Sequence, residues 1–152
     1  TFNGEPNGRR IFIGWMANWL DVKNHPETSW TCQMTVPRIL GLTLYKNELV
    51  VTQQPICEQT YEILEDVPQS GSVELTGFAK VGYNADRKVI FVNDYEAPYE
   101  PTSEKIHLKV WVDNSSVELF TADGVRSISL TLFPPLGTTR KLISGSLVDT
   151  VS

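Results

Sequence analysis

The stretch KIHLKVWVDNSSVELFTADGVRSISLTLF, residues 105–133, decides the fold because it reads as three strands joined by two turns. Every second residue from Ile106 to Val112 is aliphatic, which is the period of a strand with one buried face. Asn114-Ser115 predicts the first turn. Asp123-Gly124 predicts a two-residue type I′ hairpin, which needs positive φ at both central positions. We therefore expect an antiparallel meander whose apolar face is covered by a second sheet, giving a β-sandwich.

The first fifty-odd residues predict a separate unit of four antiparallel strands, of a kind that suits one propeller blade. Its expected strands are residues 10–16, 30–36, 40–45 and 48–53, with a hairpin around Lys46-Asn47. Further strands are expected over 61–65, 73–81 and 88–92, and a proline-punctuated loop over 94–103. The residue pattern changes after Pro55, and no apolar stripe of helical period occurs over a long stretch. We therefore expect an all-β chain with one unit over 1–55 and the sandwich over 56–152.

Composition excludes several classes of protein. The chain has 152 residues, 41% of them hydrophobic and 20% charged, so it has enough apolar material for a packed core. No apolar run approaches the roughly 18 residues of a membrane span. Thirteen basic and eighteen acidic residues give a net charge of −5, spread without long runs. We therefore expect neither a nucleic-acid nor a membrane partner, and a neutral substrate fits better.

The cysteines and the start of the chain give weaker indications. Two cysteines, Cys32 and Cys57, are too few for a disulfide framework or a zinc site, and we expect no metal and no cofactor. Two buried thiols are favoured over a Cys32–Cys57 disulfide. The first residues lack the regions of a signal peptide, and we expect the abrupt start to be a cut or processed end.

Several motifs together resemble one family. IGWMANW (13–19), WTCQMTVPR (30–38) and QQP (53–55) are similar to the last blade of the catalytic propeller of glycoside hydrolase family 32, which contains invertases, levanases and inulinases. VDNSSVELF followed by DG and FP resembles the C-terminal β-sandwich of that family, with Asn114 where the family usually has arginine. The resemblance implies an antiparallel β-sandwich preceded by one four-stranded β-propeller blade. It implies as partners a fructose-containing saccharide and the N-terminal propeller portion of the same enzyme.

The resemblance places the catalytic acids outside this chain. Retaining glycoside hydrolysis needs two carboxyl groups about 5 to 5.5 Å apart. In the family these lie in N-D-P-N-G, R-D-P and E-C motifs of earlier blades, and none of these motifs occurs here. Glu5-Pro6-Asn7-Gly8 echoes the first motif with glutamate for aspartate, and we interpret it as a turn. Cys57-Glu58 reverses the third and is interpreted as coincidence. We expect no catalytic residue in the chain.

Aromatic and amide side chains are the candidate substrate-binding residues. Sugars pack C–H faces on flat rings and bond amides through their hydroxyls, so Trp15, Asn18 and Trp19 suit a fructosyl unit. In the family this motif helps to line the substrate pocket, whereas the alternative is that one of the two tryptophans is a core residue. Arg38 is expected to make packing and inter-blade contacts, and so is Trp30.

Three residues of the meander are expected to have structural roles. Trp111 is interpreted as a cover over the neighbouring blade rather than as an exposed contact of the sandwich. Asp113 and Glu118 flank the first turn and are expected to accept hydrogen bonds from turn N–H groups.

Two classes of function remain open from the sequence. In the first, the chain is the C-terminal part of a sucrose- or fructan-hydrolysing glycosidase, with the sandwich bracing the propeller. In the second, it is a stand-alone fructan-binding module or a structural interaction domain. A blade without its neighbours would leave apolar residues bare, so we expect self-association or a retained N-terminal portion. The residues expected on that surface are Ile11, Ile13, Trp15, Met34 and Val36.

Overall fold

A computed structural model describes most of the chain. The described residues are 1–2, 4–17, 32–56, 61–66, 71–75, 79–133, 142–143 and 147–148; for 61–66, 71–75, 142–143 and 147–148 only the backbone is described. Within these ranges the chain forms strands and no helix. The class is therefore all-β, as the sequence predicts.

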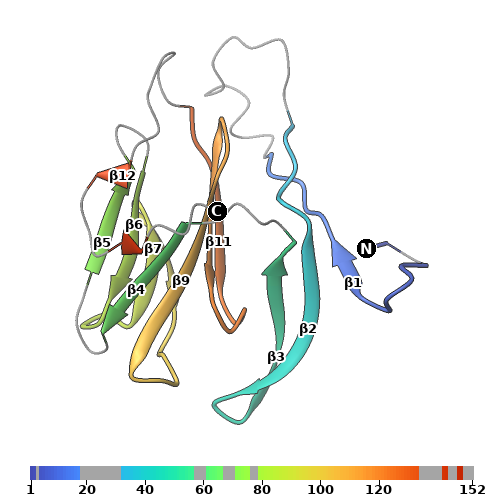
Figure 1. Ribbon diagram of the computed structural model, residues 1–152, viewed down its shortest axis with the longest axis horizontal. Coiled ribbons are helices and arrows are strands. Elements are labelled where there is room, and N and C mark those ends of the chain that lie inside the picture. Colours follow the sequence, from blue (N-terminus) through green and yellow to red (C-terminus); the bar gives the residue numbers. More distant parts are fainter. Residues whose placement is uncertain are drawn as a thin grey trace.

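The first unit is a three-stranded antiparallel sheet in the order β1-β2-β3. Its strands are β1 (Arg10–Phe12), β2 (Arg38–Tyr45) and β3 (Glu48–Pro55). Lys46 and Asn47 have φ angles of 50° and 65°, the positive pair that a two-residue type I′ turn requires. The predicted hairpin is confirmed, and β2 and β3 form the long curved ribbon beside the sandwich in Figure 1.

The remaining strands expected in the first unit are shorter than predicted. The one expected over 10–16 is a regular strand only as far as Phe12, and the described part of 30–36 pairs with it at a single bridge, Trp15 to Met34. A Cβ at Gly14 would lie 3.1 Å from the Phe12 ring, so the backbone there packs closely and only glycine fits without adjustment. In place of four strands, the described part of this unit therefore has three strands and one bridge.

The rest of the chain forms two five-stranded antiparallel sheets, which confirms the sandwich. One sheet has the order β11-β10-β9-β4-β13 and the other β12-β5-β6-β7-β8. The strands of the first sheet are β4 (Tyr61–Asp66), β9 (Lys105–Val112), β10 (Ser116–Thr121), β11 (Ser127–Thr131) and β13 (Leu147–Val148). Those of the second are β5 (Gly71–Leu75), β6 (Ala79–Asn84), β7 (Val89–Val92), β8 (Tyr95–Pro98) and β12 (Leu142–Ile143).

The core lies between these two sheets. Aliphatic side chains from both are 0% exposed, and they include Val81, Ile90, Val92, Ile106, Leu108, Val117 and Leu119. The alternation predicted over β9 is confirmed, since Ile106, Leu108 and Val110 are buried, and Val112 at the end of the strand is half-buried. Tyr45 and Val50 of the first unit pack against the same cluster, so the hairpin is joined to the sandwich by apolar contact.

Two strand predictions in the middle of the chain are wrong in detail. The single strand expected over 73–81 is divided between β5 and β6, which pair with each other as a hairpin. The loop expected over 94–103 contains β8, which pairs with β7 through Ile90 and Ala97. Prolines are tolerated there because β8 is an edge strand, where one side of the backbone has no ladder partner.

The second turn of the meander also differs from the prediction. β10 ends at Thr121 and β11 starts only at Ser127, so the connection is longer than two residues. Gly124 has a φ of 73°, but Asp123 does not have a positive φ. The Asp123 carboxylate instead accepts hydrogen bonds from the Thr121 hydroxyl (2.6 Å) and the Val125 N–H (3.0 Å). This local bonding stabilises the wider loop.

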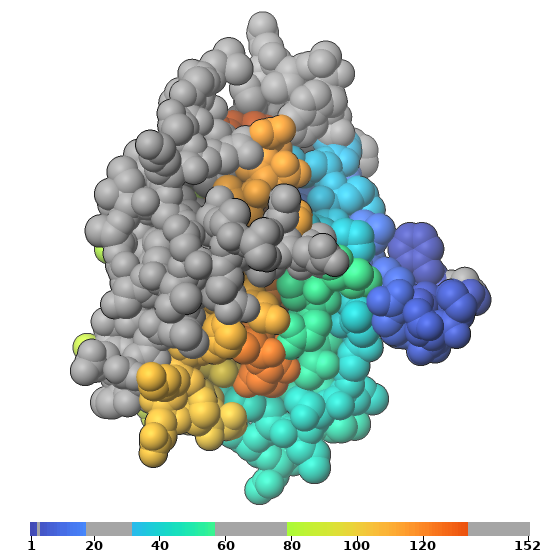
Figure 2. All heavy atoms as spheres, viewed as in Figure 1, coloured from blue at the N-terminus to red at the C-terminus, as the bar shows by residue number. Residues whose placement is uncertain are grey.

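Strand β10 is covered on both faces, and all six of its residues are buried. Val117 and Leu119 point into the sandwich core. The alternate residues Glu118 and Phe120 face the first unit, where the Arg38 guanidinium carbon lies 4.9 Å from the Phe120 ring centre. The hairpin therefore forms a third layer on the sandwich, packed against its orange strands in Figure 2. Trp111, directly opposite Glu118, shares this face, which fits its interpretation as a cover.

Candidate functional site

Trp15 stands on the segment that follows β1 and is 47% exposed. The Met16 N–H donates to the Gln33 carbonyl (3.0 Å), and the Thr35 N–H donates to the Gly14 carbonyl (2.8 Å). These bonds hold the Trp15 backbone beside the 32–36 segment and leave a large part of its indole accessible. The other two candidate residues, Asn18 and Trp19, lie outside the described residues.

The sandwich fixes the segment that carries Trp15, and Gln33 is the link. Its side-chain amide donates to the Ser115 carbonyl (2.9 Å) and to the Thr131 hydroxyl (3.0 Å). Its amide oxygen accepts from the Ser115 hydroxyl (2.5 Å). Thr131 in turn donates to the Met16 carbonyl (3.2 Å). The first meander turn and β11 therefore position the backbone next to the exposed tryptophan.

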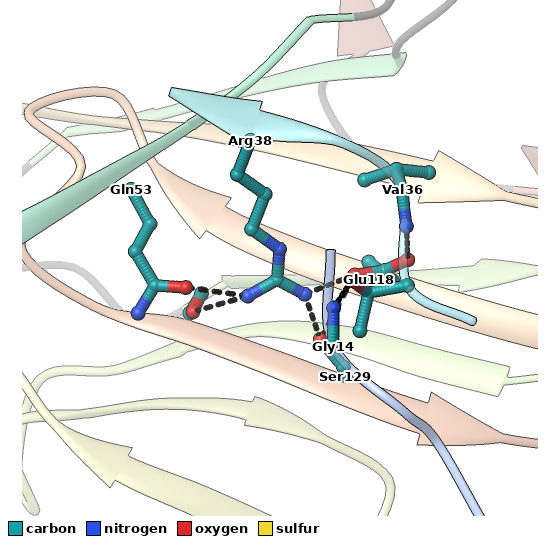
Figure 3. Close-up of polar contacts among 8 residues, drawn as sticks. Gly14, Val36, Arg38, Gln53, Glu118 and Ser129 are labelled. Atoms are coloured by element: carbon teal, nitrogen blue, oxygen red, sulfur yellow. Dashed lines mark hydrogen bonds and ion pairs between the residues drawn. The ribbon is translucent and has the colours of Figure 1, made fainter. Parts of the chain in front are cut away.

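Deeper in the interface, Arg38 and Glu118 form a buried ion pair (Figure 3). Their side chains are 5% and 1% exposed. One Glu118 oxygen accepts from the Val36 N–H (2.7 Å), and the other accepts from the Ser129 hydroxyl (2.9 Å). Arg38 also donates to the Gln53 side-chain oxygen (2.6 Å). Each charge thus has several hydrogen-bond partners, which help to offset the cost of burying the pair, although the buried Arg38 Nε has none among the described residues.

The same interface continues along β3. The Gln53 N–H donates to the Gly124 carbonyl (2.8 Å), and the Gln54 amide donates to the Ala122 carbonyl (2.6 Å). At the far end, the Tyr45 hydroxyl is 2.9 Å from both the carbonyl oxygen and the N–H of Glu100. We call these polar contacts between the first unit and the sandwich the seam. Its members are Met16, Gln33, Val36, Arg38, Tyr45, Gln53, Gln54, Glu100, Ser115, Glu118, Ala122, Gly124, Ser129 and Thr131.

The structure corrects one role and supports two others. Glu118 does not bond turn N–H groups as expected, because its carboxylate faces Arg38 across the seam. Asp113 does accept from a turn N–H, that of Asn114 (2.7 Å). The Gly8 N–H donates to the Glu5 carbonyl (3.1 Å), which closes a turn as interpreted. Hydrogen bonding from the Arg9 side chain lowers the pKa of the Glu5 carboxyl.

One face of the hairpin is apolar and exposed. Leu42 lies opposite Val51, and Leu44 lies opposite Leu49, so the four side chains share a face. Their exposed fractions are 67%, 53%, 73% and 67% in that order. We call these four residues the outer apolar face. The sequence pattern did not predict this face. Among the apolar residues expected to be exposed, Trp15 and Met34 are exposed, whereas Ile11, Ile13 and Val36 are half-buried.

The described ranges also bear on metal binding, membrane insertion and the two cysteines. No group of three or more His, Cys, Asp or Glu residues there is arranged to hold a metal ion. No helix in the same ranges is long and apolar enough to cross a membrane. Cys32 is exposed rather than buried as expected, and Cys57 lies outside the described part.

The fold and the seam define a propeller-type sheet unit docked on a β-sandwich, and sequence comparison gives the family. Residues 39–146 match the model described as "Glycosyl hydrolases family 32 C terminal", and residues 1–55 match the "Glycosyl hydrolases family 32 N-terminal domain". The first match covers more than half of the chain. The chain belongs to glycosyl hydrolase family 32.

Relatives agree with this assignment and are much longer than the chain. A levanase from Bacillus sp. (strain L7) is 28% identical over 88% of this chain and 20% of its own length. A levanase from Bacillus subtilis (strain 168) is 26% identical over 84% of this chain and 27% of its own length. The chain therefore spans about a fifth to a quarter of these two proteins.

Solved structures share the fold. The exo-inulinase of Aspergillus awamori superimposes with a TM-score of 0.62 at 23% identity, covering 82% of this chain and 35% of that one. The fructofuranosidase of Schwanniomyces occidentalis, complexed with fructose, gives a TM-score of 0.66 at 13% identity, covering 84% and 40%. At such identities the superposition shows the fold alone.

Proposed function

We propose that the chain is the C-terminal part of a β-fructofuranosidase-type glycosidase that hydrolyses fructans or sucrose, and that it is not catalytic by itself. Its first unit, residues 1–55, would be the last blade of the catalytic propeller, and residues 56–152 the sandwich that braces it. The names of the relatives, levanase above all, support the substrate class. The chain's short span relative to them supports its being one part of such an enzyme.

The bracing role rests on one observation, the buried Arg38–Glu118 pair. A buried charge pair favours one docked position, because a shift of one unit along the other would leave a charge buried without its partner. The pair therefore holds β2 at one position on β10. Gln33 extends the same fixation to the segment of Trp15. The sandwich would thus set the position of a wall of the substrate pocket.

In this proposal, Trp15, Asn18 and Trp19 bind the substrate. The exposed ring of Trp15 offers a flat surface to the C–H face of a fructosyl unit, and an amide such as Asn18 suits its hydroxyls. The catalytic carboxyl groups would come from the N-terminal portion. The outer apolar face would pack against that portion, since four large aliphatic side chains side by side favour burial.

The test is fructose release from levan, inulin and sucrose. The purified chain alone should release none. Joined to, or mixed with, the N-terminal portion of the enzyme, it should support turnover. In the active assembly Trp15→Ala should raise KM more than it lowers kcat, while Tyr95→Ala, which removes an exposed ring on β8 of the sandwich, should change neither.

Two outcomes would contradict the proposal. Turnover by the chain alone would show that it carries its own catalytic acids. An inert assembly, together with saturable binding of inulin or levan by the chain alone, would favour a stand-alone fructan-binding module.

A further inference from the structure

A cleft of about 440 Å³ opens where the tip of the hairpin meets the sandwich, away from Trp15. Its floor contains Tyr45 and Tyr99, whose rings stack in parallel with their centres 6.2 Å apart. Both rings are more than nine-tenths buried. The Tyr45 hydroxyl bonds the Glu100 backbone, and the Tyr99 hydroxyl donates to Asp123 (2.9 Å). The tyrosines therefore form a packed base whose polar atoms already have partners.

The charged rim of the cleft is mainly basic. Four basic and two acidic side chains line it: Lys46, Arg87, Lys88, Arg126, Glu48 and Glu100. The lining thus carries an excess of two positive charges in a chain whose net charge is −5, and Glu96, just outside the lining, offsets one of them through its ion pair with Arg87. Positive charges gathered in a concave site strengthen the local field and attract anions.

Arg126 is held in a fixed position at this rim. Its Nε donates to the Pro98 carbonyl (2.9 Å), and its Nη1 donates to the Val125 carbonyl (2.9 Å). Its guanidinium carbon lies 5.5 Å from the Tyr45 ring centre, a cation–π distance. A guanidinium fixed in this way is preorganised for an incoming oxyanion.

Two lysines of the rim hold one carboxylate of the chain itself between them. Lys46 contacts one carboxylate oxygen of Glu100, and Lys88 contacts the other. They come from different units, Lys46 from the hairpin turn and Lys88 from the turn before β7. Glu100 thus occupies, from within the chain, the place of an oxyanion held between two ammonium groups. A neutral sugar would not balance this charge, whereas a multivalent oxyanion would.

We propose that this cleft is a binding site for a small multivalent oxyanion, carrying phosphate or several carboxylates, with Lys46, Lys88 and Arg126 as the binding groups. Glu100 competes with the ligand for both lysines. Because the lysines belong to different units, a bound anion also links the hairpin tip to the sandwich. The inference is independent of the proposed glycosidase function.

Isothermal titration calorimetry of the purified chain tests the proposal, with inorganic phosphate and citrate as probes at an ionic strength matched with sodium chloride. We expect saturable binding of at least one probe; tighter phosphate binding indicates a phosphorylated ligand, and tighter citrate binding a polycarboxylate. The double variant Lys46→Gln/Lys88→Gln should weaken binding about tenfold. Glu100→Gln should strengthen it, because the internal competitor is lost.

Lys80→Gln is the matched control, since Lys80 is exposed on β6 and does not line the cleft, and it should leave the affinity unchanged. If the double variant does not fold, the single variant Lys88→Gln, at a side chain 62% exposed, should weaken binding in its place. The absence of saturable binding of either probe overturns the proposal. So does an affinity that the cleft variants leave unchanged.

Discussion

Arg38 and Glu118 are 80 positions apart in the sequence and form a buried ion pair that joins β2 of the first unit to β10 of the sandwich. Glu118 also accepts the Val36 N–H, so one carboxylate serves both the side chain and the backbone of the first unit. The pair marks the place where the two units share an interior.

Breaking this pair from one side should destabilise the chain strongly. Glu118→Gln leaves the Arg38 charge buried without its counter-ion, which costs about 3–5 kcal/mol of unfolding free energy. Urea denaturation followed by circular dichroism measures this loss. The double variant Arg38→Met/Glu118→Leu should lose less than the sum of the single variants, and Glu104→Gln at an exposed site should be neutral. An unchanged midpoint for Glu118→Gln would show that the pair is not buried in solution.

Two leucines of the meander should differ in their effect on stability. Leu119 is 0% exposed in β10, whereas Leu130 is half-buried on the edge strand β11. Leu119→Ala should lower the free energy of unfolding by about 2–5 kcal/mol. Leu130→Ala should lower it less, because the space left by the removed side chain would open toward solvent. Melting temperatures of the two variants test this order. Equal losses would mean that β11 is packed as tightly as β10.

Gly124 is expected to be sensitive for two separate reasons. Its φ is +73°, and an added Cβ would lie 2.9 Å from Gln54 Nε2 and 3.0 Å from the Gln53 carbonyl oxygen. Gly8 has nearly the same φ, +71°, but nothing within 4 Å of an added Cβ. Gly8→Ala should therefore lower the free energy of unfolding only by the backbone strain, about 1–2 kcal/mol. Gly124→Ala should lower it further, because the added Cβ also meets β3. Equal losses in chemical denaturation would mean that close packing against β3 contributes nothing.

The outer apolar face should make the isolated chain associate. Leu44 and Leu49 are 73% and 67% exposed as a cross-strand pair. We expect dimers or larger species in sedimentation velocity at micromolar concentration, and the variant Leu44→Ser/Leu49→Ser should shift the distribution toward monomer. Tyr95→Ser, at an exposed ring on β8, is the control and should leave association unchanged. A monomeric unmodified chain would contradict this expectation.

Tyr99 should make stability fall at high pH. Burial raises the pKa of its phenol, and the nearby Asp123 carboxylate raises it further. The phenol then ionises more readily in the unfolded chain, whose tyrosine pKa is about 10. The stabilisation of the fold by the neutral Tyr99 phenol is therefore fully present below about pH 10. It is lost as the pH rises from there toward the pKa of the phenol in the folded chain. Denaturation midpoints between pH 8.5 and 11 should fall less for Tyr99→Phe, and parallel slopes would argue against the shift.

The parts of the fold that the sequence predicted are those with local signals. Alternating residues in 106–112 and the Lys46-Asn47 turn depend on neighbours in the chain, and both were confirmed. The second meander turn was mispredicted because Asp123 bonds Thr121 and Val125 and so stabilises a wider loop than the Asp-Gly pair suggests.

The seam and the outer apolar face had no local signal. Glu118 alternates with Val117 and Leu119, which is the pattern of a solvent-facing residue on a half-buried strand. Its face is instead covered by a unit whose arginine lies 80 positions earlier. The outer apolar face consists of aliphatic residues of the type that fills protein cores. Only the position of these residues on the exposed face of the hairpin shows that nothing within the described chain covers them.

The burial of β10 on both faces has a consequence for any attempt to divide the chain. A sandwich excised at residue 56 would carry Glu118 and Phe120 on a bare sheet surface, and the excised hairpin would carry Arg38 with no counter-ion. The point where one sequence segment ends and the next begins is thus not a point of mechanical separation. A recombinant form of the protein should therefore keep residues 1–55 and 56–152 together in one chain.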